Sequence, residues 1–321
     1  MKLGVFAVLL ADMPFDKACQ YLASQGVTHI EVGCGGHPGK AHCDPEILLN
    51  DKAKLDAFKG AIKDAGLTIS AFSCHGNPIH PNKDIAKGFH DDFMNALRIA
   101  NECEVDRVIG FSGCPGDSEN SLYPNWVTCP WPDDFPKILE WQWNEKLIPY
   151  WTDMAKTANE YGVNRIAFEM HPGFCVYNPE TLLKLRAAVG NTIGANLDPS
   201  HFFWQGIDPV AAVKELKDAI YYVHAKDTAI DVDNTKKNGV LDTKHFGREA
   251  ERSWIFRTVG YGHDMQWWRE FVSALRLVGY DDVLSIEHED SLMTPKEGLE
   301  KAIKFLKDTL IFEGKTDMWW A

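Results

Sequence analysis

Carboxylate and imidazole side chains follow four short apolar runs of this sequence, where buried strands would not be expected to carry charge. The four segments are Phe168-Glu169-Met170-His171, Asn196-Leu197-Asp198-Pro199-Ser200-His201, Val223-His224-Ala225-Lys226-Asp227 and Ser285-Ile286-Glu287-His288-Glu289. If the runs are parallel strands of one barrel, their ends meet at one mouth. The donors brought together would be three carboxylates and one imidazole, from Glu169, Asp198, His224 and Glu287. This oxygen-rich set suits one divalent ion, and we expect Mn²⁺, with Mg²⁺ or Co²⁺ as alternatives.

Such an ion can bind two neighbouring oxygens of a sugar, which makes the proton beside the carbonyl acidic and stabilises the enediolate that forms. Glu169 and Glu287 could then act from opposite faces, so that one removes a proton and the other returns it. The expected chemistry is epimerisation or aldose–ketose isomerisation. For any single carboxylate a solvated strand end or a salt bridge is an equal alternative, and only the four together favour a metal site.

Three further histidines are candidates for the same mouth. His171 follows Glu169 by two residues and His201 follows Asp198 by three, while His75 ends another apolar run. We take His171 as a catalytic candidate and His75 and His201 as substrate-binding candidates. For His171 and His201, a hydrogen bond that only orients a metal ligand is the alternative.

The third and fourth segments leave two choices open. Lys226 and Asp227 could orient His224, contact a substrate hydroxyl or simply form a local ion pair, and Lys226 is kept as a substrate-binding candidate. Glu287 and Glu289 lie on the same side of a strand, because side chains alternate with a period of two. We prefer Glu287 as the ligand because it lies nearer the body of the strand.

Short β-branched or aromatic runs alternate with longer stretches of helical period, which is typical of a parallel sheet wrapped by helices. The eight expected strands are Lys2–Leu10, Ile30–Gly33, Thr68–Cys74, Arg107–Phe111, Arg165–Met170, Ile193–Leu197, Tyr221–Ala225 and Val283–Glu287. The helices expected between them include Asp51–Ala65, Ile85–Cys103, Trp143–Tyr161, Pro179–Val189, Pro209–Asp218, Met265–Val278 and Pro295–Leu310. Eight such units predict an α/β protein of the (β/α)₈ TIM barrel type. Without linker-like segments we expect one domain over residues 1–321, with a C-terminal tail from about residue 312.

Two insertions interrupt the alternation, Pro115–Pro136 after the fourth strand and Thr228–Asp264 after the seventh. We expect long loops there, at the face of the barrel that carries active sites, and treat both as candidate lids. The first contains Tyr123, Trp126 and Trp131, whose rings could stack on a sugar or an aromatic aglycone, or equally plug the barrel rim. Trp126 is included as a substrate-binding candidate.

Composition limits the partners. Lys plus Arg number 33 and Asp plus Glu 46, and the net charge of −13 argues against nucleic acid and anionic lipid surfaces. Eight cysteines without a C-x-x-C pair indicate reduced thiols in a cytoplasmic protein. No run approaches the roughly 18 apolar residues of a membrane span. We expect a small-molecule sugar or glycoside as substrate, and the tryptophans outside the barrel leave a homo-oligomer open.

With these residues placed, the chain resembles the xylose-isomerase-like TIM barrel superfamily, in its sugar phosphate isomerase/epimerase branch, over nearly its whole length. The resemblance is carried by the four segments above together with Gly260-Tyr261-Gly262. It implies that the carboxylates and imidazole of the four strand ends hold one divalent ion, as in ketose 3-epimerases. It also implies that His201 and, with a match displaced by the long insertion, Arg257 lie near the substrate. The sequence lacks a Gly-rich helix start that would cradle a phosphate, so a phosphorylated substrate is not expected.

Two alternatives remain at this point. The Glu-x-His arrangement of Glu169 and His171 also resembles the large subunit of bacterial C-glycoside deglycosidases. That resemblance implies a carbon–carbon lyase acting on 3-oxo-C-glycosides, with His171 as base and a small β-rich partner subunit. The other alternative is a non-catalytic sugar-binding barrel, which the intact set of four ligand candidates disfavours.

Overall fold

The computed structural model of the protein describes residues 1–320. Within them a closed barrel of parallel strands is formed in the order β1-β10-β7-β6-β5-β4-β3-β2. The barrel strands are β1 (Lys2–Phe6), β2 (His29–Gly33), β3 (Thr68–Ser73), β4 (Arg107–Gly110), β5 (Arg165–Glu169), β6 (Ile193–Leu197), β7 (Ile220–Ala225) and β10 (Val283–Ile286). Each strand is hydrogen-bonded to parallel neighbours on both sides, and the predicted (β/α)₈ fold is confirmed.

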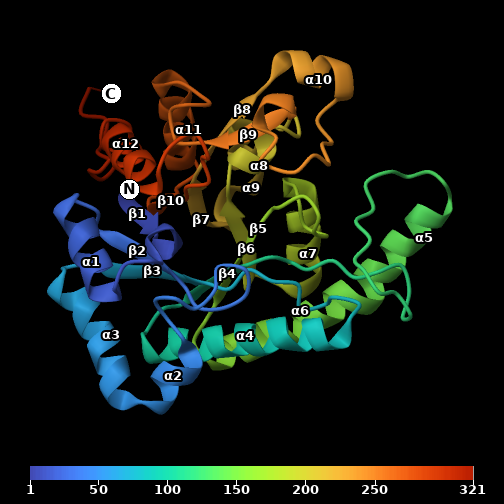
Figure 1. The fold of residues 1–321 in the computed structure, drawn as a ribbon, viewed down its shortest axis with the longest axis horizontal. Helices are drawn as coiled ribbons and strands as arrows, with labels where there is room; N and C mark the ends of the chain where they lie inside the picture. Colours follow the sequence, from blue (N-terminus) through green and yellow to red (C-terminus); the bar gives the residue numbers. More distant parts are fainter. Residues whose placement is uncertain (321) are drawn as a thin grey trace.

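Helices follow the strands and cover the outside of the barrel (Figure 1). They are α1 (Phe15–Ser24), α2 (Pro45–Asn50), α3 (Lys52–Asp64), α4 (Lys83–Glu102), α5 (Asp134–Trp141), α6 (Ile148–Glu160), α7 (Pro179–Val189), α8 (Ser200–Phe203), α9 (Pro209–Leu216), α10 (Val232–Asn238), α11 (Met265–Leu277) and α12 (Pro295–Lys307). Short 3₁₀ turns occupy Ala7–Leu10, Lys217–Ala219 and Glu249–Glu251, and a π-helical segment, Gln142–Leu147, joins α5 to α6. No helix among the described residues is long and apolar enough to cross a membrane.

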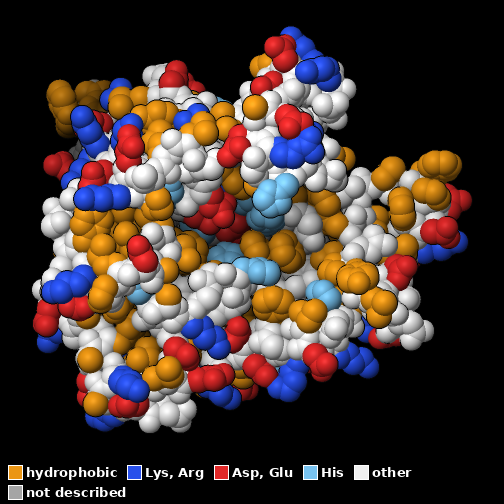
Figure 2. Space-filling view, viewed as in Figure 1, with side chains coloured by type: hydrophobic (Ala, Val, Ile, Leu, Met, Phe, Trp, Pro, Cys, Tyr) orange, Lys and Arg blue, Asp and Glu red, His pale blue; other side chains and the backbone are white. Residues whose placement is uncertain are grey.

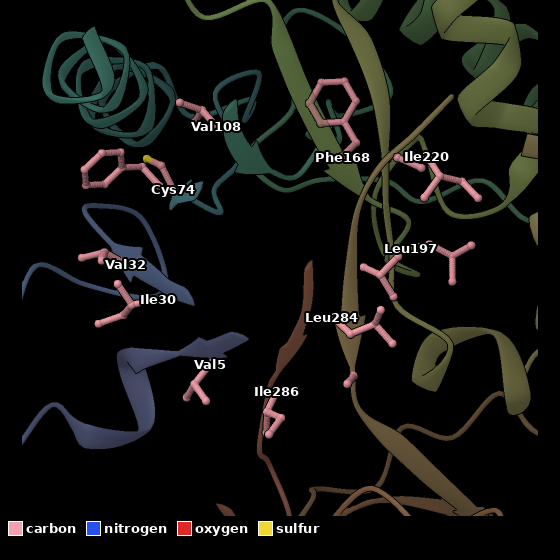
Figure 3. Packing of buried hydrophobic residues seen from close by; sticks show 14 of the residues in the cluster. Val5, Ile30, Val32, Cys74, Val108, Phe168, Leu197, Ile220, Leu284 and Ile286 are labelled. Atoms are coloured by element: carbon pink, nitrogen blue, oxygen red, sulfur yellow. The ribbon is translucent and has the colours of Figure 1, made fainter. Parts of the chain in front are cut away.

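Alternation along each strand divides the side chains between the helices and the barrel interior. Apolar side chains that face the helices form the main core, and Figure 3 shows Val5, Ile30, Phe168 and Leu284 among them. The intervening positions point inward. At the middle of the barrel these are mostly apolar or small, whereas toward the carboxyl ends of the strands they become acidic and imidazole side chains.

Most expected boundaries fall within three residues of the observed ones, and two were wrong by more. The first strand ends at Phe6, and the apolar run continues as a 3₁₀ turn over Ala7–Leu10 whose Ala7 and Leu10 side chains remain buried. The apolar pattern therefore extends beyond the end of the strand, because the turn that follows is also buried. The helix expected from Trp143 begins earlier, because α5, the π-helical segment and α6 follow one another without a break.

The two insertions differ in structure. Residues 111–133 contain no regular element and lead into α5, and part of this stretch projects with α5 away from the barrel as an arm (Figure 1). The second insertion was expected to be a loop, but it contains the antiparallel hairpin of β8 (Asp227–Ile230) and β9 (Trp254–Arg257) with α10 between its strands. Backbone pairing explains the difference, since the hairpin satisfies hydrogen bonds that a bare loop would leave to water.

Candidate metal centre and active site

Four side chains from the carboxyl ends of β5, β6, β7 and β10 converge in the barrel mouth. Glu169 is the last residue of β5 and His224 lies in β7, while Asp198 and Glu287 come one residue after β6 and β10. One potential ligand atom from each lies within 4.8 Å of those of the other three. The structure therefore brings together the four residues that the sequence proposed as metal ligands.

Several atoms of this cluster lack hydrogen-bond partners. His224 Nδ1 lies 2.9 Å from Glu287 Oε2 and 3.3 Å from Glu169 Oε2. His224 Nδ1, Glu287 Oε2 and Asp198 Oδ2 are nevertheless buried without a satisfactory hydrogen bond among the described residues. Buried polar atoms are normally paired, and three carboxylates beside one imidazole are the donors that hard divalent cations prefer. The residues present thus fit one divalent ion.

Imidazoles surround Glu169. His201 Nε2 lies 3.0 Å from Oε1, and His75 Nε2 lies 3.1 Å from Oε2. Burial raises the pKa of Glu169, but the neighbouring imidazoles of His201, His224 and His75 outweigh it and hold the pKa well below its ordinary value. Glu169 is therefore a carboxylate at neutral pH, as a proton acceptor or ligand must be.

The other two carboxylates have different environments. Burial raises the pKa of Asp198 to about 6, against the favourable charges of His201 and Lys226. Burial also raises the pKa of Glu287, but Lys226 and His224 overcome it and lower the value to about 2. The cluster thus combines a readily ionised Glu287 with an Asp198 that pays a penalty for its charge when no cation is near.

Lys226 distinguishes Glu287 from Glu289. Its buried Nζ lies 2.6 Å from Glu289 Oε2 and 3.4 Å from Glu287 Oε2, and 4.2 Å from the centre of the Phe256 ring. Glu289 is half exposed and lies outside the ligand cluster, whereas Glu287 lies within it. The structure accordingly places Glu287, the preferred residue, among the potential ligands.

His171 lies at the edge of the same mouth. Its Nδ1 is 2.6 Å from the carbonyl oxygen of Pro172, which can only accept, so Nδ1 carries the proton. Its ring centre lies 4.1 Å from that of His201, and burial followed by the charge of His201 lowers the pKa of His171 to about 3. The neutral ring keeps a lone pair on Nε2, which suits a base or a hydrogen-bond acceptor. Glu169, His171 and His201 also have potential ligand atoms within 4.8 Å of one another.

A cavity of about 210 Å³ opens onto the cluster. Its polar lining includes His75, Glu169, His171, Lys226 and Glu287, and its apolar wall includes Phe6 and Phe111. Figure 2 shows acidic and histidine side chains at the bottom of a hollow near the centre of this face. A larger depression of about 710 Å³ near α2 and α4 contains none of the four cluster residues, so the smaller cavity is the candidate substrate site.

Two substrate-binding candidates lie elsewhere. Arg257 Nε is 3.1 Å from Asp290 Oδ2, and Trp126 packs edge-on against Tyr177 with ring centres 5.4 Å apart. Neither lines the cavity. Arg257 belongs to β9, whose pairing with β8 fixes its direction, and Trp126 is folded onto the core rather than presented to solvent. The exposed aromatics of the first insertion, Tyr123 and Trp131, lie on the projecting arm.

Asp227, for which the sequence left several roles open, is a structural hub of the second insertion. It is fully buried and accepts hydrogen bonds from six N–H groups, which belong to the backbones of Thr228, Gly260, Gly262 and His263, to the His263 ring and to the Trp268 indole. These donors tie the end of the hairpin to α11. Asp227 is not among the residues that line the cavity.

Glu31 is a buried charged residue that the sequence analysis did not single out. It lies in the middle of β2 and is completely buried, with His224, Ser73 and Ser285 as its partners. The signal was present in the sequence, because Ile30-Glu31-Val32-Gly33 carries a charge inside an expected strand rather than at its end.

Comparison with known proteins gives a consistent assignment. A sequence model of the xylose isomerase-like TIM barrel family matches residues 19–309. The chain is 38% identical over 312 residues to the uncharacterized protein YfiH of Bacillus subtilis (strain 168), covering 97% of this chain and 99% of that protein. It is 24% identical to an inosose dehydratase of Geobacillus thermodenitrificans (strain NG80-2), covering 93% and 90%. Among solved structures, a D-psicose 3-epimerase from Clostridium cellulolyticum H10 with D-tagatose matches with a TM-score of 0.61 and 14% identity, covering 96% of this chain and 98% of that one.

Proposed function

Since this chain belongs to the xylose isomerase-like TIM barrel family, we propose that it is a divalent-metal-dependent isomerase or epimerase of a sugar or keto-sugar. The observation that carries the proposal is the convergence of Glu169 and Glu287, which line the cavity, with Asp198 and His224 in one cluster whose ligand atoms are left unpaired. Asp198, His224 and the two glutamates would hold the ion, and Mn²⁺ is the ion we expect. When bound, it would supply a Lewis acid that polarises a carbonyl and favours negative charge on neighbouring oxygens.

The residues of the chain would move the proton. Glu169 and Glu287 both line the cavity but belong to different sides of the barrel, on β5 and after β10. Glu169 would take the proton from the carbon beside the carbonyl, while His75 and His201 keep its oxygens in place. Glu287, after taking up a proton from a substrate hydroxyl or from water, would deliver it from the other face, which inverts the carbon or moves the carbonyl along the chain, and Glu169 would then release its proton to solvent.

The size and lining of the cavity favour a small, neutral, hydroxyl-rich substrate. A volume of about 210 Å³ suits a single sugar ring or open-chain sugar rather than an oligosaccharide. Lys226 is the one lysine or arginine that lines it, and Glu289 and Glu287 already neutralise its ammonium group. A phosphate would thus meet more carboxylates than cations here.

A second candidate function is a lyase that begins with the same proton abstraction. His171 favours it, because its Nε2 lone pair is a further proton acceptor in the cavity, beyond the two carboxylates that an epimerase needs. Its substrate would be a 3-oxo-C-glycoside. Removal of the proton beside the carbonyl would form an enolate, whose electron pair breaks the carbon–carbon bond to the aglycone, and the aglycone carbon would take up a proton as it leaves. The similarity to an inosose dehydratase agrees with elimination chemistry in the family.

Proton exchange in D₂O, followed by NMR, tests the proposal. Wild type, Glu169→Gln and the surface control Glu160→Gln would be compared with Mg²⁺ present, on free ketohexoses and on a 3-oxo-glucoside. Exchange into a free ketose with a new epimer or aldose, lost only in Glu169→Gln, is the expected result. Exchange or aglycone release from the 3-oxo-glucoside alone would favour the lyase. Exchange that is absent from both substrates, or independent of the metal, would refute the shared mechanism.

A further inference from the structure

Glu31 occupies an unusual position for a charged residue, inside the barrel below the candidate metal centre. Its carboxylate is fully buried on β2 and contacts side chains from three other strands. Ser73 Oγ on β3 lies 2.5 Å from Oε1, and Ser285 Oγ on β10 lies 2.6 Å from Oε2. His224 Nε2 on β7 lies 3.0 Å from Oε1 and 3.1 Å from Oε2. A carboxylate this well supplied with donors is held in one orientation.

These contacts determine which nitrogen of His224 faces the ligand cluster. A carboxylate only accepts hydrogen bonds, so the proton shared with Glu31 belongs to Nε2. The lone pair of a neutral ring is then on Nδ1, the atom that lies nearest Glu287 and Glu169. Nε2 of His224, on the side away from the cluster, is therefore fixed by Glu31. Nδ1, on the side toward the cluster, is left free to bind a cation.

We propose that Glu31 is a positioning residue, which fixes the tautomer and direction of His224 and raises its affinity for a divalent ion. The proposal rests on the metal centre of the proposed function. Carboxylates that accept the second N–H of a metal-binding histidine commonly strengthen metal affinity by about 10–100-fold. Here the carboxylate comes from β2, and it joins β2, β3, β7 and β10 beneath the centre.

Glu31→Gln is a sharp test because of the near-equal distances from His224 Nε2 to the two carboxylate oxygens. Whichever way the glutamine amide is turned, its NH₂ group lies beside Nε2. The NH₂ group can only donate, so Nε2–H loses one of its two acceptors, and relative to wild type the balance shifts toward the tautomer with its proton on Nδ1, where a cation would have to bind. A change of one atom should therefore oppose metal binding without changing the volume of the side chain.

The measurements are the Mn²⁺ dissociation constant, from the EPR signal of the free ion, and the visible spectrum of the Co²⁺-loaded protein. The full chain would be used as wild type, Glu31→Gln and Ser70→Ala. Ser70 is a matched control, since its buried hydroxyl contacts Tyr222 and the Ile30 carbonyl but not Glu31. We expect Glu31→Gln to bind Mn²⁺ about 10–100-fold more weakly and to shift the Co²⁺ spectrum, with Ser70→Ala unchanged.

A second variant guards against misfolding. Ser285→Ala removes one donor to Glu31 and keeps the carboxylate, and we expect a smaller loss of Mn²⁺ affinity with the same direction of spectral change. Unchanged Mn²⁺ affinity and Co²⁺ spectrum in Glu31→Gln or, if that variant does not fold, in Ser285→Ala would overturn the proposal. Failure of wild type to bind Mn²⁺ or Co²⁺ would overturn the metal centre itself, and the role of Glu31 with it.

Discussion

Glu169 and Asp227 are both buried carboxylates near the carboxyl ends of barrel strands, yet their surroundings differ in kind. Asp227 accepts hydrogen bonds from six N–H groups, which belong to its own insertion and to α11. Glu169 lies beside two further carboxylates of the cluster, and several atoms around it have no hydrogen-bond partner. A buried charge whose hydrogen bonds are all made stabilises the fold, whereas a group of buried carboxylates with too few donors is suited to binding a cation.

Residues of the ligand cluster and residues that stabilise the fold lie next to each other in the sequence. In the run His224-Ala225-Lys226-Asp227, the histidine joins the ligand cluster, the lysine lines the cavity and the aspartate holds the hairpin. Neighbouring polar side chains in one segment of the sequence thus have different roles, some in the candidate active site and one in stabilising the fold. Four predictions test this division, from the largest expected effect to the smallest.

Glu169→Gln should reduce metal-dependent proton exchange by about 10³-fold, because the amide cannot accept the substrate proton. The fold should persist, since Gln keeps the volume of the side chain and can still bond to the surrounding imidazoles. Exchange rates in D₂O, with circular dichroism as the check on folding, measure both. Activity within a few-fold of wild type would mean that the catalytic base lies elsewhere.

Asp227→Asn should lower the free energy of unfolding by about 3 kcal/mol, because either orientation of the amide turns its NH₂ toward N–H donors. The Mn²⁺ affinity of the folded protein should stay close to wild type. Urea denaturation and Mn²⁺ titration give the two numbers. If metal affinity fell while stability held, the assignment of Asp227 to structure would be wrong.

Gly262→Ala should lower the free energy of unfolding by about 2 kcal/mol, because a Cβ there would overlap the Thr228 carbonyl oxygen and Asp227 Oδ1. Gly60→Ala in α3 is the control, since a Cβ at that position meets open space. The control should be neutral or slightly stabilising. Equal thermal stability of the two variants would show that the contacts around Asp227 contribute little.

Asp198→Asn should raise the free energy of unfolding of the metal-free protein by about 1–2 kcal/mol at neutral pH while it weakens Mn²⁺ binding. The pKa of Asp198 is raised to about 6, so folding disfavours its ionised form above that pH. The folded protein binds a proton that the unfolded chain has lost, so the advantage of the variant shrinks as pH falls from about 6 to about 4. Urea denaturation in EDTA across this range measures it, and a destabilised variant at pH 7 would contradict the prediction.

The sequence was informative where polar residues interrupted an apolar pattern. Glu169, Asp198, His224 and Glu287 could be proposed because each follows a run of strand-like residues, and the structure brings them together. Arg257 and Trp126 could not be placed in the same way. Both belong to insertions, where no period relates position to direction, and neither lines the cavity.

The sequence did not show which buried carboxylates would find enough hydrogen-bond donors. Asp227 and Glu31 are charged residues beside or within expected strands, as the ligand candidates are, and all their donors except the adjacent Thr228 N–H come from positions far away in sequence. Glu31 takes Ser73, His224 and Ser285 as partners, and only closure of the barrel brings these strands together.

The sequence by itself determined the alternation of eight strands with helices, the polar strand ends and therefore the face at which chemistry would occur, because these depend on local period and burial. The tertiary structure decided which carboxylates remain unsatisfied, that Glu287 rather than Glu289 joins the cluster, and that Glu31 supports His224. Those outcomes depend on which donors meet in space, and a pattern along one chain does not contain that information.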